Sequence, residues 1–392
     1  MDYSSARSKN PGELNQKCLG QTQKKLKSLL NNATQTRYSQ RSHRRLCVYF
    51  WMFIASTTYL ISPQAEAAAT HRLLTTQPGF NAHDIAIIIN DLSPMSQRIG
   101  DYYQRARKIP SENIVRIRFK VSGTIMPPSV FNQLIESIKQ QTPKSVQAYV
   151  LTWSKPYRVG CMSITTAFAA GYNDAFCANK CNPTLSNPYY NSESHYPYDD
   201  YGWRPTMTLA GSSFEDVRQL IDRGIASDYT FPTGKAYLVT TSDRARSSRS
   251  GSFPAIKKYF DKFWDTHVVN ADSIQNKSDV MFYFTGLKSV PNIKSNRFLP
   301  GAIADHLTST GGMLTDSRQM SILRWLEAGV TGSYGAVIEP CNFPQKFPNP
   351  GIIMLNYLRG SSLIEAYWKS VAWPGQGIFV GEPLAKPFGN SR

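Results

Sequence analysis

The sequence predicts an α/β protein in which helices cover both faces of a mostly parallel sheet, a three-layer, doubly wound architecture. Two observations lead to this prediction. Short apolar, β-branched runs such as residues 84–90 are typical of strands that are buried on both faces. Segments with helical spacing and capping signals lie between these runs, so strand and helix alternate along the chain.

The first part of the chain sets up this alternation. A strand is predicted at residues 84–90, and Ser93-Pro94 then starts a helix that continues to about Arg107, because Ser caps a first turn and Pro is favoured at its first position. Strands are also predicted at residues 113–119 and 146–153, with a helix at residues 128–140 between them.

The alternation resumes after residue 204. Helices are predicted at about residues 213–226, 253–266, 301–308 and 318–328, and strands at residues 235–241, 280–286 and 330–339. Two short helices follow, the second at residues 362–372, and a last strand at residues 377–380. We interpret residues 70–392 as a single α/β domain; a split into two lobes near Arg204 is the alternative.

Residues 155–204 do not follow the alternation of strand and helix. They are predicted to form an insertion that is rich in cysteine and aromatic residues. Long loops inside compact domains are usually functional, and the aromatic content argues against disorder. Aromatic faces suit sugar stacking, and acidic neighbours could add hydrogen bonds or hold a calcium ion. The spacing of these acidic residues, however, matches no calcium-binding loop. The alternative is that the rings pack beneath the loop. The candidate ligand-binding residues are Tyr189, Tyr190, Tyr196, Tyr198 and Trp203.

Residues 1–69 are predicted to be a secretory signal peptide that is not part of the fold. A basic lead precedes an apolar run at residues 46–61 and an alanine-rich exit at residues 65–69. The alternative is an uncleaved anchor, but sixteen apolar residues are fewer than the roughly 20 that span a bilayer. We therefore expect a soluble mature protein in the periplasm or outside the cell.

The charge balance narrows the class of partner. The net charge of the whole chain is +17. Residues 1–67 carry ten basic and three acidic side chains, a net charge of +7, so the mature part keeps a net charge of +10. Such an excess suits acidic glycans or lipid headgroups, or serves solubility alone. Nucleic acid is not an expected partner, because the sequence contains no basic stripe with interleaved aromatic residues. The glycine-rich residues 311–312 and 332–335 lack the lysine of a phosphate loop, so no cofactor is predicted.

Four cysteines lie in the predicted mature part: Cys161, Cys177, Cys181 and Cys341. An even number in an oxidising compartment predicts two disulfides, for which three pairings are possible. We favour Cys177 with Cys181 and Cys161 with Cys341. A zinc site at the close pair is the alternative, but no second pair completes four ligands, and no metal is predicted.

Three residues form the candidate catalytic group. Cys341 ends an apolar run, where α/β proteins often place their sites, and a thiol nucleophile needs a base. His306 is the candidate base, and Glu339 could reach the same cleft. A disulfide at Cys341 and a packing role for His306 are the alternatives.

The residues that follow the predicted strand at 235–241 form a candidate anion site. Asp243, Arg244 and Arg246 lie at the strand's carboxyl end, the side of an open sheet where ligands bind. Guanidinium groups beside a carboxylate could bind a peptide carboxylate or a uronate. A solvated turn is the alternative.

Several blocks resemble a family of exported bacterial proteins that occurs in bacteria carrying exosortase, a membrane transpeptidase proposed to sort exported proteins. The blocks are residues 160–165, 237–243, 284–286, 299–312, 332–335, 339–342 and 365–370. The resemblance implies an exported protein and assigns no catalytic residues.

The last 70 residues are also distantly similar to gingipain-type, caspase-like cysteine peptidases. In that family one strand ends in His-Gly and the next strand supplies the cysteine. Here Thr285-Gly286 stands at the first position, and the second falls near residues 313–315, which contain no cysteine. The similarity therefore implies a caspase-like scaffold without the peptidase pair.

We therefore expect an exported binding or accessory factor of the envelope or of exosortase sorting. Its partners would be envelope glycan or exported sorting substrates. The alternative function is a thiol hydrolase or peptidase that uses Cys341, and the sequence favours the non-enzymatic interpretation.

Overall fold

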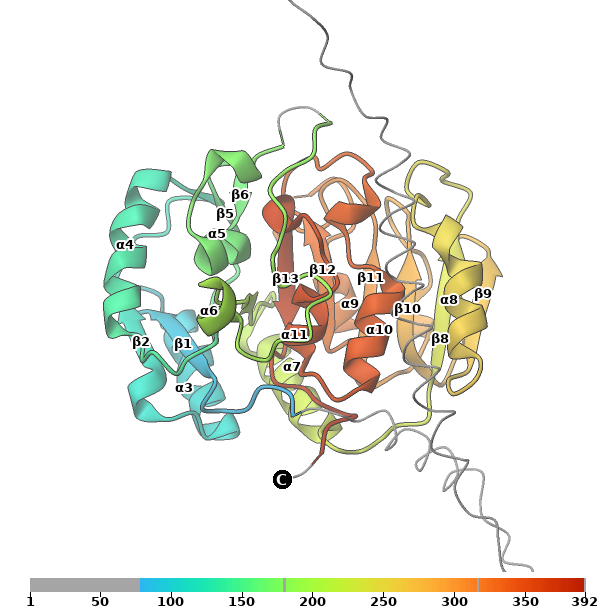
Figure 1. Cartoon of the computed structure of the whole chain (residues 1–392), viewed down its shortest axis with the longest axis horizontal. Helices are drawn as coiled ribbons and strands as arrows, with labels where there is room; N and C mark the ends of the chain where they lie inside the picture. The colour runs from blue at the N-terminus through green and yellow to red at the C-terminus, as the bar shows by residue number, and fades with distance from the viewer. Residues whose placement is uncertain (1–77, 179–180, 316, 391–392) are drawn as a thin grey trace, which may run out of the picture. The chain divides into compact units, whose positions relative to one another are not determined.

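The computed structural model describes residues 78–178, 181–315 and 317–390. At its centre is a ten-stranded sheet in the order β2-β1-β4-β7-β13-β12-β11-β10-β8-β9 (Figure 1). The strands of this sheet are β1 (Ile85–Asn90), β2 (Ile114–Ile117), β4 (Ala148–Leu151), β7 (Thr206–Thr208), β8 (Lys235–Thr240), β9 (Thr266–Asn270), β10 (Val280–Thr285), β11 (Phe298–His306), β12 (Gly332–Ala336) and β13 (Gly377–Gly381).

The large sheet is mostly parallel. Strands β2, β1, β4 and β7 pair in parallel, and so do β12, β11, β10, β8 and β9. Strand β13 joins the two groups and is antiparallel to β12. A second sheet has the order β3-β5-β6 and consists of β3 (Ile125–Met126), β5 (Arg158–Val159) and β6 (Met162–Ser163).

Helices connect and cover these strands. The α-helices are α3 (Pro94–Arg107), α4 (Pro128–Gln141), α5 (Ile164–Ala170), α6 (Pro197–Tyr201), α7 (Phe214–Ser227), α8 (Phe253–Phe260), α9 (Leu323–Glu327), α10 (Pro350–Leu358) and α11 (Leu363–Trp368). Short 3-10 turns are η1 (Ser111–Asn113), η2 (Asp174–Phe176), η3 (Ser250–Ser252), η4 (Ile293–Ser295), η5 (Pro344–Lys346) and η6 (Pro374–Gln376). None of the helices in the described ranges combines the length and apolar character that a membrane span requires.

Two neighbouring residues of β10 show that helices lie on both faces of the sheet. Phe282 packs against Tyr357 of α10, with ring centroids 6.3 Å apart, whereas Tyr283 packs against Trp325 of α9 at 5.1 Å. Successive side chains of a strand point to opposite faces, so α10 and α9 cover opposite sides. The predicted three-layer α/β class with a mostly parallel sheet is confirmed.

Local signals in the sequence set several helix starts. The Ser93 side chain accepts a hydrogen bond from the Ser96 backbone N–H, and Pro94 occupies the first turn of α3. Ser213 and Asp216 form a reciprocal capping box at the start of α7. Each cap satisfies N–H groups that have no partner inside the helix. The α3 helix ends at Arg107, as predicted.

Two predicted helices were wrong, and one strand was not predicted. Residues 301–308 belong mostly to β11 rather than to a helix, because Ala302, Ile303 and Ala304 lie in a central strand buried on both faces. The helix predicted at residues 253–266 ends at Phe260, and Thr266 begins the edge strand β9. The three-residue strand β7 was missed.

The described residues of the predicted insertion, 155–178 and 181–204, include the short elements β5, β6, α5, η2 and α6. The large sheet continues past Arg204, since β4 pairs with β7 on the other side of that residue. The predicted signal peptide and its cleavage site lie outside the described residues.

Candidate functional site: the carboxyl edge of four parallel strands

Four adjacent parallel strands, β12, β11, β10 and β8, end at one edge of the sheet. Residues 241–249 follow β8, residues 286–292 follow β10, residues 307–315 and 317–319 follow β11, and residues 337–342 follow β12. In open α/β sheets, this is the edge where ligands bind. We call these residues the carboxyl edge.

Hydrogen bonds between the loops hold the carboxyl edge together. Arg246 donates from Nε to Oγ1 of Thr308 at 2.9 Å and from NH1 to Asp243 at 2.7 Å. Asn342 donates from Nδ2 to the Ala245 carbonyl at 3.1 Å. The loops that follow β8, β11 and β12 are therefore fixed relative to one another without a ligand.

Glycine is required where these loops approach the strands. A Cβ at Gly286 would lie 1.8 Å from the carbonyl oxygen of Arg246. A Cβ at Gly312 would lie 2.3 Å from the carbonyl oxygen of Gly335, and one at Gly335 would lie 2.5 Å from the Gly312 nitrogen. These glycines therefore serve close backbone packing.

A buried ion pair lies beneath the edge. Arg249 donates from NH2 to Asp305 Oδ1 at 2.6 Å and to the Thr285 carbonyl at 2.7 Å, and both charged side chains are buried. Its NH1 group donates to the Pro348 carbonyl at 3.0 Å. A planar guanidinium with several acceptors is suited to such a position. Arg249 thereby anchors the loop after β8 to the ends of β10 and β11.

The cysteines form two disulfides, Cys161–Cys177 and Cys181–Cys341. The predicted presence of disulfides is confirmed, but the favoured pairing was wrong. The Cα atoms of Cys181 and Cys341 are 5.5 Å apart, within the range that a disulfide spans, although 160 residues separate them in the chain. Proximity in the sequence did not predict the pairing of Cys181, because the part of the insertion that carries Cys181 lies beside the end of β12.

The disulfide changes the interpretation of Cys341. In this form its sulfur is bonded to Cys181 and carries no thiol that could attack a substrate. Glu339 is exposed, and its Oε1 accepts the Cys341 backbone N–H at 2.8 Å, so it shapes the turn that presents Cys341.

His306 is buried, and both of its ring nitrogens have protein partners. Its Nδ1 accepts from Nε1 of Trp325 at 2.9 Å, and its Nε2 lies 3.0 Å from the Met320 carbonyl. Nε2 must therefore carry the proton, and the ring is neutral. Burial lowers the pKa of His306 to about 4. The ring nitrogens of His306 therefore pair with Trp325 and Met320, while the sulfur of Cys341 is bonded to Cys181.

The strand end predicted near residues 313–315 was also misplaced. The strand beside β10 is β11, and Thr285 of β10 pairs with His306 of β11 in the sheet. The neighbouring strand ends are thus a threonine and a buried neutral histidine.

Asp243 and Arg244 lie on the carboxyl edge with different surroundings. Partial burial raises the pKa of Asp243, but its hydrogen bonds from Arg246 outweigh this and leave the pKa below its ordinary value. Arg244 is exposed, and no ion pair engages it in the described ranges. Arg318 is likewise exposed, one residue before Gln319, whose Oε1 accepts from Thr308.

Most of the predicted aromatic residues pack inward. Tyr189 is fully buried, and Trp203 packs edge-on against Phe176 and Trp368 at 5.7 and 6.3 Å. The Arg204 guanidinium carbon lies 3.2 Å from the ring centre of Tyr198. Tyr190 is partly buried, whereas Tyr196 is 61% exposed. A stacking platform built from all five rings is therefore not present in the described structure.

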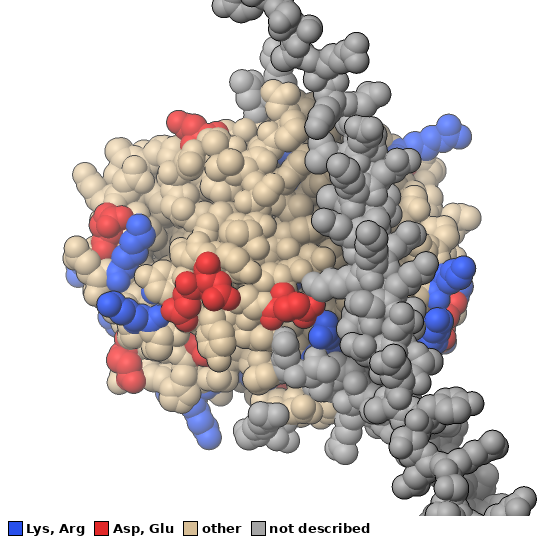
Figure 2. All heavy atoms as spheres, viewed as in Figure 1, with Lys and Arg blue, Asp and Glu red and all other residues tan. Residues whose placement is uncertain are grey.

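Acidic side chains gather over α6, which follows Tyr196 (Figure 2). They include the exposed Asp199 and Asp200 of its first turn. Asp199 accepts from Gln147 at 3.0 Å, and Asp200 accepts from the Ser194 hydroxyl at 2.5 Å. Both carboxylates therefore hold the insertion in place.

One buried group that joins the insertion to α11 was not predicted from the sequence. Glu365 is fully buried and accepts from the backbone N–H groups of Phe80 and Ser362 at 2.8 and 2.9 Å. Its other oxygen lies 3.1 Å from Nδ1 of His195. Burial raises the pKa of Glu365, but His195 and the positive charge of Lys369 outweigh it and bring the pKa to about 2. The capping motif Ser362-x-x-Glu365 was the available signal.

One group among the described residues has the composition of a metal site. The ligand atoms of Cys161, Asp174 and Cys177 lie within 4.8 Å of one another. The disulfide between the two cysteines uses both sulfurs, which as thiolates would be the metal ligands. The oxidised form therefore offers only the carboxylate.

Comparisons with known proteins add little to these observations. No family model matches the chain, and no curated protein matches it. A solved structure titled "Structure of Protease" is similar with a TM-score of 0.41 and 9% sequence identity, over 79% of each chain. Nothing about the activity of this chain follows from a similarity at that level.

Proposed function

We propose that this chain is an exported, disulfide-stabilised binding protein of the cell envelope, whose carboxyl edge binds an anionic ligand through Arg244. The observation that carries the proposal is the contrast between Arg244 and Arg246. Arg246 is engaged by Asp243 and Thr308, whereas Arg244 two residues earlier is exposed on the same loop. Arg246 thus fixes the loop, and Arg244 is presented to solvent.

The ligand class follows from the chemistry of this group. A guanidinium binds carboxylates through two parallel hydrogen bonds, and Arg318 offers a second such group on the adjacent loop. A uronate of an envelope glycan and the carboxylate of an exported peptide both fit. The two disulfides support an oxidising compartment.

A narrower role rests on the resemblance of residues 299–312 and 339–342 to the exported family of exosortase-bearing bacteria. In that role, the protein is an accessory factor that binds exported sorting substrates. The alternative function, a thiol hydrolase, requires a reduced Cys341 and a base other than the engaged His306.

Titration calorimetry of the exported protein tests the proposal. The probes are oligogalacturonate and a peptide with either a free or an amidated C-terminus. We expect one carboxylate probe to bind and Arg244→Gln to weaken that binding at least tenfold. Arg105→Gln removes the same charge from an exposed position on α3 and should change binding less than twofold. No binding of either probe, or an equal effect of both variants, would contradict the proposal.

A further inference from the structure

The loop between β2 and α4 carries apolar side chains into solvent. Val121 is 41% exposed and Ile125 is 44% exposed, and Val130 in the first turn of α4 is 38% exposed. These are three of the eight most exposed large apolar side chains in the described part of the chain. We call residues 118–130 the apolar loop. Clustered exposed apolar residues indicate an interaction surface.

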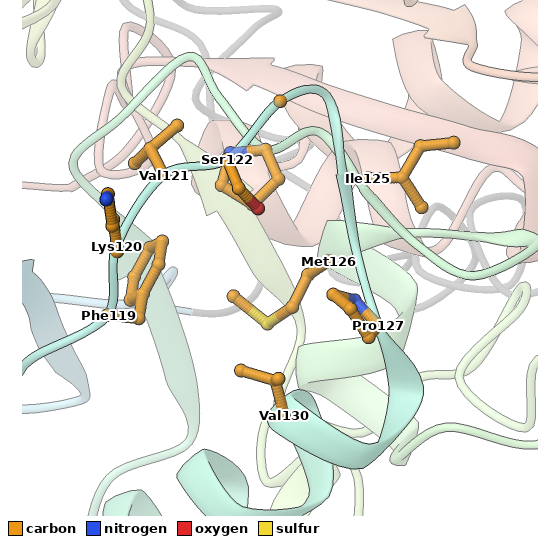
Figure 3. A pocket seen from close by; sticks show the side chains of 10 residues that line it. Phe119, Lys120, Val121, Ser122, Ile125, Met126, Pro127 and Val130 are labelled. Atoms are coloured by element: carbon orange, nitrogen blue, oxygen red, sulfur yellow. The ribbon is translucent and has the colours of Figure 1, made fainter.

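The base of the apolar loop is fixed by the small sheet. Ile125 and Met126 of β3 pair with Arg158 and Val159 of β5. Because successive side chains alternate, Met126 points inward and is buried while Ile125 points outward. Figure 3 shows Met126 directed toward Val130, with Ile125 turned away from them. The outward direction of Ile125 is therefore set by strand pairing.

A mainly apolar pocket of about 100 Å³ is lined mostly by residues of this loop. Phe119 and Met126 belong to its lining and are buried, and Phe119 packs on Trp153 with ring centroids 5.3 Å apart. At the tip, Gly123 has a φ of +143°, and a Cβ there would meet no atom within 4 Å. The tip thus stands clear of the rest of the fold.

Within residues 118–130, the charged side chains have one sign. Arg118 and Lys120 are exposed, and residues 118–130 contain no aspartate or glutamate. No ion pair involves either cation in the ranges that the structure describes. An apolar group beside unpaired cations is complementary to an anionic lipid surface, whose phosphates attract the cations while its acyl region takes up the apolar side chains.

We propose that the apolar loop binds an anionic phospholipid membrane. Val121, Ile125 and Val130 enter the boundary between headgroups and acyl chains, and Arg118 and Lys120 contact lipid phosphates. This surface includes no residue of the carboxyl edge, so membrane binding and ligand binding can be tested separately.

Sedimentation with lipid vesicles tests this proposal on the exported protein. The vesicles contain either equal parts of phosphatidylglycerol and phosphatidylcholine or phosphatidylcholine alone. We expect binding to the anionic vesicles, at least tenfold weaker binding to the neutral ones, and a further loss as salt is raised. The double variant Val121→Asp/Ile125→Asp should lose binding at least tenfold.

The control Tyr229→Asp changes another exposed apolar residue, which is 40% exposed and follows α7, and should bind like the unmodified protein. Near-ultraviolet circular dichroism verifies that each variant is folded. Equal binding to both vesicle types, or full binding by the double variant, would overturn the proposal. So would a loss of binding in the control equal to that in the double variant.

Discussion

Trp325 donates a hydrogen bond from its indole N–H to Nδ1 of His306 at 2.9 Å. The acceptor nitrogen of the imidazole is thereby occupied inside the protein. The other ring nitrogen lies 3.0 Å from the Met320 carbonyl. A general base needs an accessible lone pair, and in this structure both ring nitrogens of His306 already have protein partners.

The burial of His306 predicts a pH dependence of stability. The folded-state pKa of His306 is about 4, against an ordinary value of 6.5, because burial disfavours the charged ring. Between these values the unfolded chain binds the proton and the folded chain does not. The contribution is fully present above pH 6.5 and is lost as pH falls toward 4. The free energy of unfolding in urea should decrease by about 3 kcal/mol across this window.

The variant His306→Asn provides the control for this prediction. Its amide oxygen can accept from Trp325 but does not titrate. The variant should have a clearly smaller slope of unfolding free energy between pH 6.5 and 4. An unchanged slope in the variant would show that another group causes the effect.

Breaking the buried ion pair beneath the carboxyl edge should be strongly destabilising. Asp305→Asn leaves the Arg249 charge buried without its carboxylate, and we expect a loss of roughly 3–5 kcal/mol in urea unfolding. The double variant Asp305→Leu/Arg249→Met removes both charges and should be less destabilised than the sum of its single changes. Additive effects would mean that the two side chains do not interact.

Glu365→Gln should weaken the attachment of the insertion. The change removes the charge that meets His195 and Lys369, and we expect a loss of about 3 kcal/mol. Because the pKa of Glu365 is about 2, against an ordinary 4.5, its contribution is present above pH 4.5 and lost as pH falls toward 2. Urea unfolding at pH 7 measures the first effect. The exposed Glu136→Gln should change stability by less than about 0.5 kcal/mol.

Gly286→Ala should disturb the carboxyl edge directly. The added carbon would lie 1.8 Å from a backbone oxygen that cannot rotate away, so the loop after β8 must shift. We expect a loss of about 2 kcal/mol or more in urea unfolding. Gly251→Ala is the matched control, since a Cβ there meets nothing within 4 Å. Similar stabilities for the two variants would contradict the close packing at Gly286.

The sequence predicted the fold class because strand and helix signals are local. The run at residues 84–90 and the Ser93 cap each need only a few neighbours. The wrong prediction at residues 301–308 has a different cause. The local composition, with two alanines, is compatible with a helix, but the segment forms a strand because it is buried between two layers of helices. Tertiary burial overrides propensity in such positions.

The candidate site was predicted in part. The end of the strand before Asp243 and the end of the strand before Cys341 do meet at one edge, through Asn342 and Ala245. The disulfide partner of Cys341 could not be predicted, since it depends on where a 50-residue insertion returns to the fold. The inward packing of Tyr189 and Trp203 likewise depends on contacts with distant elements.

A peptide map of the protein under non-reducing conditions, after alkylation of any thiol, tests whether Cys341 is held in a disulfide. We expect a cross-linked peptide containing Cys181 and Cys341, a second containing Cys161 and Cys177, and no alkylated cysteine among these four. Alkylated Cys341 would contradict the binding-protein interpretation and make a thiol-dependent reaction the hypothesis to pursue.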